Sequence, residues 1–77
     1  LVVAYIDAPD CYGTIFELGC AARAGTPYVV LFAPGIDAPD FWYLQQRQAR
    51  FRAPHVVSRR QLSSVFASIL DQWRLAQ

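Results

Sequence analysis

Methionine and lysine are both absent from this sequence of 77 residues, and only two cysteines are present. Two cysteines are too few for a disulfide framework, so we interpret them as reduced thiols. There is no signal-peptide pattern and no apolar run near the ~20 residues that span a bilayer, so we expect a cytoplasmic protein without a membrane partner. Because methionine is missing and the chain starts inside an apolar run, we expect that an N-terminal portion is missing.

The charges almost balance, because seven basic residues stand against six acidic ones and give a formal net charge of +1. So small a charge favours no polyanion, and we expect no nucleic-acid polymer as a partner. Hydrophobic residues make up 55% of the chain, above the roughly 45–50% that is usual for soluble domains. We interpret this excess as surface that is hidden against something else. The length allows one small domain, residues 1–77.

Strand and helix patterns alternate along the chain. Continuous apolar runs, typical of strands covered on both faces, occupy 1–6 and 28–32, and a short third strand is expected at 55–57. Helical patterns are expected at 14–24, at 37–51, and after a capping box formed by Ser58 and Gln61. The order β-α-β-α-β-α predicts an α/β fold with parallel strands and right-handed crossovers. With the missing βαβ portion it would complete a three-layer, flavodoxin-like (Rossmann-like) sheet.

The most informative stretch joins the first strand to the first helix. It brings three carboxylates, Asp7, Asp10 and Glu17, to one strand-to-helix connection. In open α/β sheets this is where ligands bind, and a carboxylate there can attack or stabilise the anomeric carbon of a sugar. The structural alternative is a capping box of Thr14 and Glu17 in the first helical turn, with Gly13 supplying only a tight turn.

The same stretch carries a family resemblance. Over about Val2 to Pro34 the chain resembles the nucleoside 2-deoxyribosyltransferase family, through Asp10-Cys11-Tyr12-Gly13-Thr14-x-x-Glu17-Leu18-Gly19-x-Ala21 and then Ala24-Gly25-x-Pro27 before an apolar strand. The resemblance implies an enzyme that cleaves the N-glycosidic bond of a nucleoside or nucleotide and passes the sugar to a second base or to water. It also implies a homo-oligomer. The chemistry requires neither a metal nor an organic cofactor.

The resemblance also implies roles for single residues. Glu17 matches the nucleophile that takes the sugar at C1 as a covalent intermediate, and Asp10 matches a catalytic aspartate that contacts the sugar. Asp10 lies one position further from Glu17 than the family's usual spacing, so either Tyr12 is an extra residue or Cys11 takes the aspartate's place.

Substrate-binding roles are implied for Asp7, Tyr12, Gly13 and Thr14. The family's acid that assists departure of the base would lie before Leu1. The chain is therefore expected to hold only the nucleophile half of the site and to lack full activity by itself.

Two other functions stay open. Gly13-Thr14-x-x-Glu17 also resembles the second half of the P-G-G-x-G-T-x-x-E motif of the cytokinin-activating, lysine decarboxylase-like phosphoribohydrolases, which cleave N-glycosidic bonds too. The alternative from another class is a non-catalytic nucleotide-binding or oligomerisation module. Three consecutive helical residues cannot face one core, so at least one of Phe41, Trp42 and Tyr43 is expected in a subunit interface or over the substrate base, and the family resemblance favours the interface.

Overall fold

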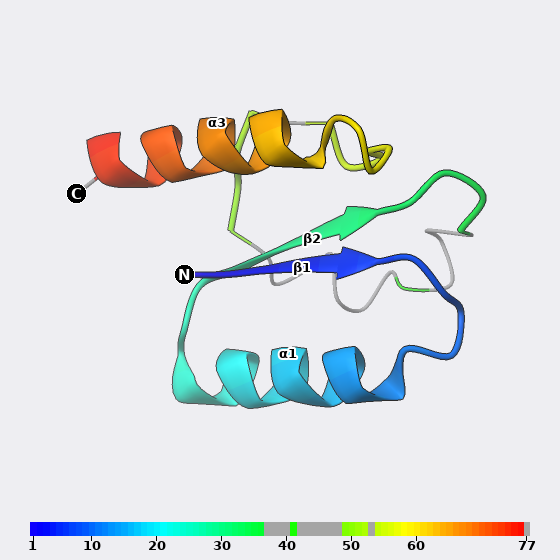
Figure 1. Ribbon diagram of the computed structural model, residues 1–77. Coiled ribbons are helices and arrows are strands. Elements are labelled where there is room, and N and C mark those ends of the chain that lie inside the picture. The colour runs from blue at the N-terminus through cyan, green and yellow to red at the C-terminus, as the bar shows by residue number, and fades with distance from the viewer. Residues whose placement is uncertain (37–40, 42–48, 53, 77) are drawn as a thin grey trace.

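The computed structural model describes residues 1–36, 41, 49–52 and 54–76 of the chain. The regular elements of this part are β1 (Val2–Ile6), α1 (Tyr12–Ala24), β2 (Tyr28–Phe32) and α3 (Leu62–Leu75) (Figure 1). The two strands are parallel, with Val2 opposite Tyr28 and Ile6 opposite Phe32. The α/β class and the parallel pairing expected from the sequence are therefore confirmed.

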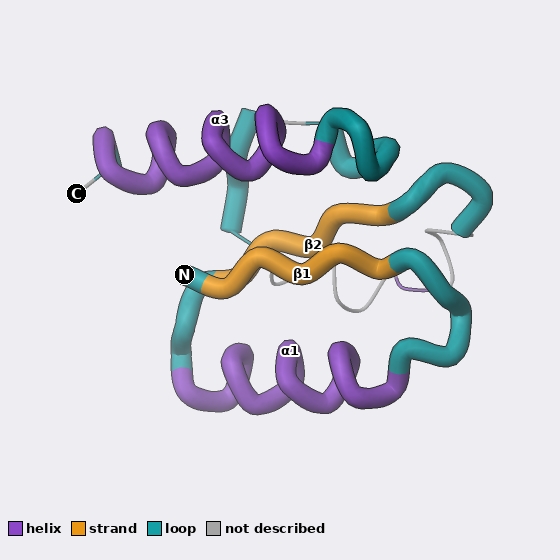
Figure 2. The backbone as a smooth tube through the Cα atoms, viewed as in Figure 1, coloured by secondary structure: helices purple, strands orange, loops and turns teal. Residues whose placement is uncertain are grey.

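The helices α1 and α3 lie on opposite sides of the paired strands (Figure 2). Side chains of successive strand residues point to opposite faces of a sheet, so each helix packs on one set of alternate residues. One buried cluster joins Leu18 of α1 to the even-numbered strand residues Ala4, Ile6, Tyr28, Val30 and Phe32. A second joins Ile69 of α3 to Val29, Leu31 and Val57. Because both faces of β2 are covered, all five of its residues are buried.

The third predicted strand, at 55–57, is reduced to a single parallel bridge between Phe32 and Val56. The Phe32 N–H donates to the His55 carbonyl at 2.7 Å, and the Val57 N–H donates to the Phe32 carbonyl at 2.8 Å. This contact extends the sheet beyond β2 without forming a full strand. The described residues therefore show part of the expected β-α-β-α-β-α order, and they do not show a complete three-layer sheet.

The helix predicted over 37–51 falls mostly outside the described residues. Its expected end at Phe51 is wrong, because residues 49–51 are not helical. The Ala49 N–H instead donates to the Tyr28 carbonyl of β2 at 2.7 Å. The backbone at Ala49 therefore forms a hydrogen bond with the edge of β2. The hydrophobic pattern of the sequence does not reveal which backbone groups pair in this way. Of the three consecutive aromatics, Phe41 alone is described. It is buried, 5.8 Å from the Phe32 ring between centroids.

Helix ends differ in how well local sequence predicts them. Gly25 ends α1 as expected, in the left-handed conformation with φ 74°, which glycine adopts at little steric cost. The capping box expected before the last helix is wrong, since α3 starts after Gln61 without a side-chain cap. The Ser58 Oγ instead donates to the side-chain oxygen of Gln61 at 3.3 Å. Neither helix is long and apolar enough to cross a membrane, nor is any other helix among the described residues.

Gln72 of α3 forms hydrogen bonds with the segment 49–52, which follows the pairing of Ala49 with the edge of β2. Its side-chain oxygen accepts from the Arg52 N–H at 2.8 Å, and its Nε2 donates to the Arg52 carbonyl at 2.9 Å. We expect Gln72→Ala to lower the free energy of unfolding by about 1–2 kcal/mol, because two partly solvated hydrogen bonds are lost together. Urea denaturation followed by circular dichroism measures the change.

The matched control is Asp71→Ala, at the exposed neighbouring position. Substitutions at such surface positions usually change stability by less than about 0.5 kcal/mol. Equal stability of Gln72→Ala and Asp71→Ala would show that the hydrogen bonds between the Gln72 side chain and the Arg52 backbone contribute nothing to the free energy of unfolding.

Candidate functional site

The connection from β1 to α1 positions the three predicted carboxylates differently. Asp7, directly after β1, accepts from Arg59 Nη2 at 2.7 Å, which pairs the end of β1 with the turn before α3. The Asp7 and Arg59 side chains are 42% and 79% exposed, so water screens the pair and its contribution to stability is small. Asp7, which was predicted to bind substrate, therefore forms an ion pair with Arg59 instead.

The start of α1 overturns the capping-box interpretation of Glu17. The helix begins at Tyr12, with Cys11 as N-cap and no side-chain cap, and its first turn contains no acidic residue. It begins before Thr14 because the Ile15 N–H already donates to the Cys11 carbonyl at 3.1 Å and closes a helical turn there. Thr14 thus lies inside the helix and Glu17 lies in its second turn, and the expectation that Glu17 belongs to the first turn is wrong.

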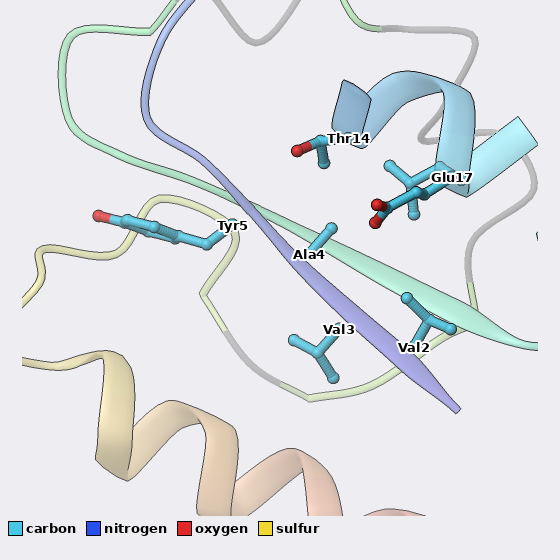
Figure 3. A pocket seen from close by; sticks show the side chains of 7 residues that line it. Val2, Val3, Ala4, Tyr5, Thr14 and Glu17 are labelled. Carbon is cyan, nitrogen blue, oxygen red and sulfur yellow. The ribbon is translucent and has the colours of Figure 1, made fainter. Parts of the chain in front are cut away.

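Thr14 and Glu17 face a shared pocket. Residues three apart on a helix are neighbours on its surface, and Figure 3 shows both side chains extending from α1 on the side of β1. The pocket has a volume of about 230 Å³ and is lined by Thr14, Glu17, Leu18, Val2, Val3, Ala4 and Tyr5. Glu17 is exposed, and its carboxylate has no hydrogen-bond or ion-pair partner among the described residues. An unpaired carboxylate therefore stands beside a largely apolar wall.

The pocket follows the free edge of β1. The Val2 N–H donates to the Pro27 carbonyl, and the Ile6 carbonyl accepts from the Ala33 N–H, so these groups point toward β2. Backbone groups alternate in direction along a parallel strand, and those of Val3 and Tyr5 therefore point the opposite way. Within the described part of the chain no strand pairs with this edge. The sequence led us to expect a site beyond the carboxyl end of β1, whereas the pocket lies alongside the strand.

The remaining predicted site residues do not line this pocket. Asp10 is exposed in the turn before α1, where its carbonyl accepts from the Tyr12 N–H at 2.9 Å. Tyr12 is 75% exposed. Gly13 is helical rather than part of a tight turn, and a Cβ placed on it would meet nothing within 4 Å. The structure therefore brings together Thr14 and Glu17, and leaves Asp7, Asp10, Tyr12 and Gly13 outside.

Tyr5 is a pocket residue that the sequence analysis missed. It lies in an otherwise apolar run, and no signal in the sequence marks it as part of a pocket. Its hydroxyl donates to the Val57 carbonyl at 2.7 Å, which fixes the ring on the α3 side of β1. The other missed wall residues, Val2 to Ala4, look like any core strand in the sequence. Their role follows only from the free edge.

No metal centre is formed by the described residues, which contain no group of three or more histidine, cysteine, aspartate or glutamate side chains able to hold an ion. Comparison with protein-family models, with curated proteins and with solved structures finds no match to this chain. The resemblance to the nucleoside 2-deoxyribosyltransferases therefore depends on the motif between Asp10 and Pro27 alone.

The exposure of Glu17 leads to a stability prediction. We expect Glu17→Gln to change the free energy of unfolding by less than about 0.5 kcal/mol, because the exposed carboxylate has no hydrogen-bond or ion-pair partner among the described residues. Its neighbour Leu18 is 1% exposed, and Leu18→Ala should cost about 2–5 kcal/mol through the cavity it leaves. Thermal and urea unfolding of both variants measure the difference. A loss in Glu17→Gln as large as in Leu18→Ala would assign Glu17 a structural role.

Proposed function

We propose that this chain carries the nucleophile of an enzyme that cleaves the N-glycosidic bond of a nucleoside or nucleotide. The observation that carries the proposal is the Glu17 carboxylate, which is exposed and unpaired in a pocket between α1 and β1. A carboxylate without a partner among the described residues is available as a nucleophile, and it can stabilise the positive charge that develops at C1. The motif around Glu17 supplies the second support.

The proposed reaction has two steps at one carbon. A Glu17 oxygen attacks C1 of the sugar, the bond from C1 to the base nitrogen breaks, and the base leaves with the electron pair and takes up a proton. A second base or water then attacks C1, the ester bond between C1 and Glu17 breaks, and the free carboxylate returns. Positive charge develops at the sugar ring in both steps, and a carboxylate at C1 stabilises it.

The dimensions of the pocket suit the sugar. Pockets that enclose a whole drug-sized ligand occupy about 300–1,000 Å³, and this one occupies about 230 Å³. We therefore place the sugar beside Glu17 and the base outside the described walls. The Thr14 hydroxyl, on the same flank of α1, is suited to bind a hydroxyl of the sugar.

The finer fold assignment belongs to the same proposal. A further parallel strand beside β1 would extend the sheet toward the flavodoxin-like, three-layer arrangement of the resembled family. It would occupy the part of the pocket that follows the backbone edge of β1 and place a new strand beside Glu17, from which an acid could assist departure of the base. The homo-oligomeric state and the cytoplasmic location remain predictions from the sequence.

The test is turnover of a panel of nucleosides and nucleotides by the purified full-length protein, with and without a second base, followed by chromatography. We expect Glu17→Gln and Glu17→Ala to reduce base release by at least about 10³-fold, because removal of a nucleophile removes the covalent route. Intact-mass measurement should find a sugar adduct on the wild-type protein that Glu17→Gln does not form.

The matched control is Asp71→Asn, which makes the same acid-to-amide change on α3 at an exposed position outside the pocket. Its turnover should equal that of the wild type. Unchanged turnover in Glu17→Gln would remove Glu17 as the nucleophile. Release of bases only from ribonucleoside 5′-monophosphates would favour the phosphoribohydrolase, and no release from any substrate would favour the non-catalytic module.

A further inference from the structure

The outward side of α1 carries a row of exposed residues that the proposed reaction does not use. Tyr12 and Phe16 are 75% and 73% exposed, and Gly19 and Arg23 continue the row, both exposed as well. The successive spacings of four, three and four residues place all of them along one side of a helix. We call these four residues the outer stripe. The buried Leu18 lies on the other side of α1, against the strands.

The two helices differ in what they expose. α1 contains two charged residues, Glu17 at the pocket and Arg23 in the last turn, together with the polar Thr14. The exposed positions of α3 include Ser63, Ser64, Ser68 and Asp71, and its two large exposed hydrophobics, Phe66 and Leu75, lie nine positions apart rather than one turn apart. A helix that is apolar on its inner and outer sides is usually covered on both, and adjacent exposed aromatics mark interaction surfaces. Tyr12 and Phe16 are thus the two neighbouring large hydrophobic side chains that α1 exposes.

We propose that the outer stripe packs against the outer stripe of a second copy of this chain, with the two α1 helices antiparallel about a two-fold axis. The first half of the stripe carries the two aromatics Tyr12 and Phe16, and the second half carries Gly19, which has no side chain, and the cation Arg23. A two-fold rotation brings the large half of one copy over the small half of the other. Such self-complementarity is what an isologous interface requires.

Gly19 supports this arrangement, because no contact within the described part of the chain requires a glycine there. A Cβ placed on it would meet no atom within 4 Å, and the residue lies in the middle of α1 without a positive φ. Glycine inside a helix is less favourable than alanine. On the outside of the helix it leaves a hollow into which the Phe16 ring of a second copy fits.

Charge selects the antiparallel orientation. Asp10 lies just before α1 and Arg23 lies in its last turn, and neither side chain has an ion-pair partner among the described residues. In an antiparallel pair the Arg23 end of one helix lies beside the Asp10 end of the other, and this contact occurs twice. A parallel pair would place like charges together. Opposite charges at the rim fix the register of an interface.

The proposal is independent of the N-glycosidic reaction. Of the residues of α1 that line the pocket, which are Thr14, Glu17 and Leu18, none belongs to the outer stripe. A dimer through the stripe therefore leaves the Glu17 pocket accessible, and its test uses oligomeric state rather than turnover.

Sedimentation velocity of the purified protein over a range of concentrations, in low salt, tests the interface. We expect a reversible dimer of the wild type, and at least about tenfold weaker dimerisation for Phe16→Ala, because a central aromatic is removed. Phe66→Ala is the matched control: this aromatic is 43% exposed on α3 and lies outside the stripe, so the dimer should persist. Circular dichroism checks that each variant is folded.

A charge exchange distinguishes a second copy from any other partner. Asp10→Arg and Arg23→Asp should each weaken the dimer severalfold, and the double variant should recover most of the loss, because both opposite-charge contacts are restored with exchanged signs. A monomer at all concentrations would overturn the proposal. So would a dimer that Phe16→Ala leaves unchanged, or a double variant no tighter than the single ones.

Discussion

The described structure depends on the complete enclosure of β2. All five of its residues are buried, so every backbone N–H and C=O of the strand needs a partner within the protein. β1 supplies partners along one edge, and Ala49 together with residues 55–57 supplies them along the other. The two faces are closed by side chains from α1 and α3. Segments far apart in the sequence are held together because each one satisfies a different side of this strand.

β1 has almost the same apolar composition as β2 but a different environment. Only Ala4 and Ile6 are buried in it, because the edge that faces away from β2 is unpaired among the described residues. Exposed edges in natural sheets usually carry charged residues, proline or bulges that prevent pairing, and Val2 to Ile6 contain none of these. The Glu17 pocket exists because of this edge. The candidate site is thus formed by the unpaired edge strand of the sheet together with α1.

The helix α1 has three differently used sides: one packs in the core, one lines the pocket and one faces outward. Leu18 closes the core, Thr14 and Glu17 face the pocket, and Tyr12 with Phe16 is presented to the outside. This division explains why the amphipathic pattern of α1 is weak although the helix is well packed. A periodic search for one apolar stripe finds such a helix less readily than α3, whose outer positions are mostly small and polar.

Local sequence determined the elements of this protein, because burial imposes a period of two on strands and 3.6 on helices, and because glycine alone adopts the left-handed end of α1 easily. The strand at 28–32 and the stop at Gly25 follow from these rules. Tertiary structure decided the start of α1, the bridge at Val56 and the pairing of Asp7 with Arg59 across 52 positions. It also decided which of the six predicted site residues lie together. Those outcomes depend on which backbone groups and side chains the fold brings into contact, and the spacing of residues along the sequence does not determine these contacts.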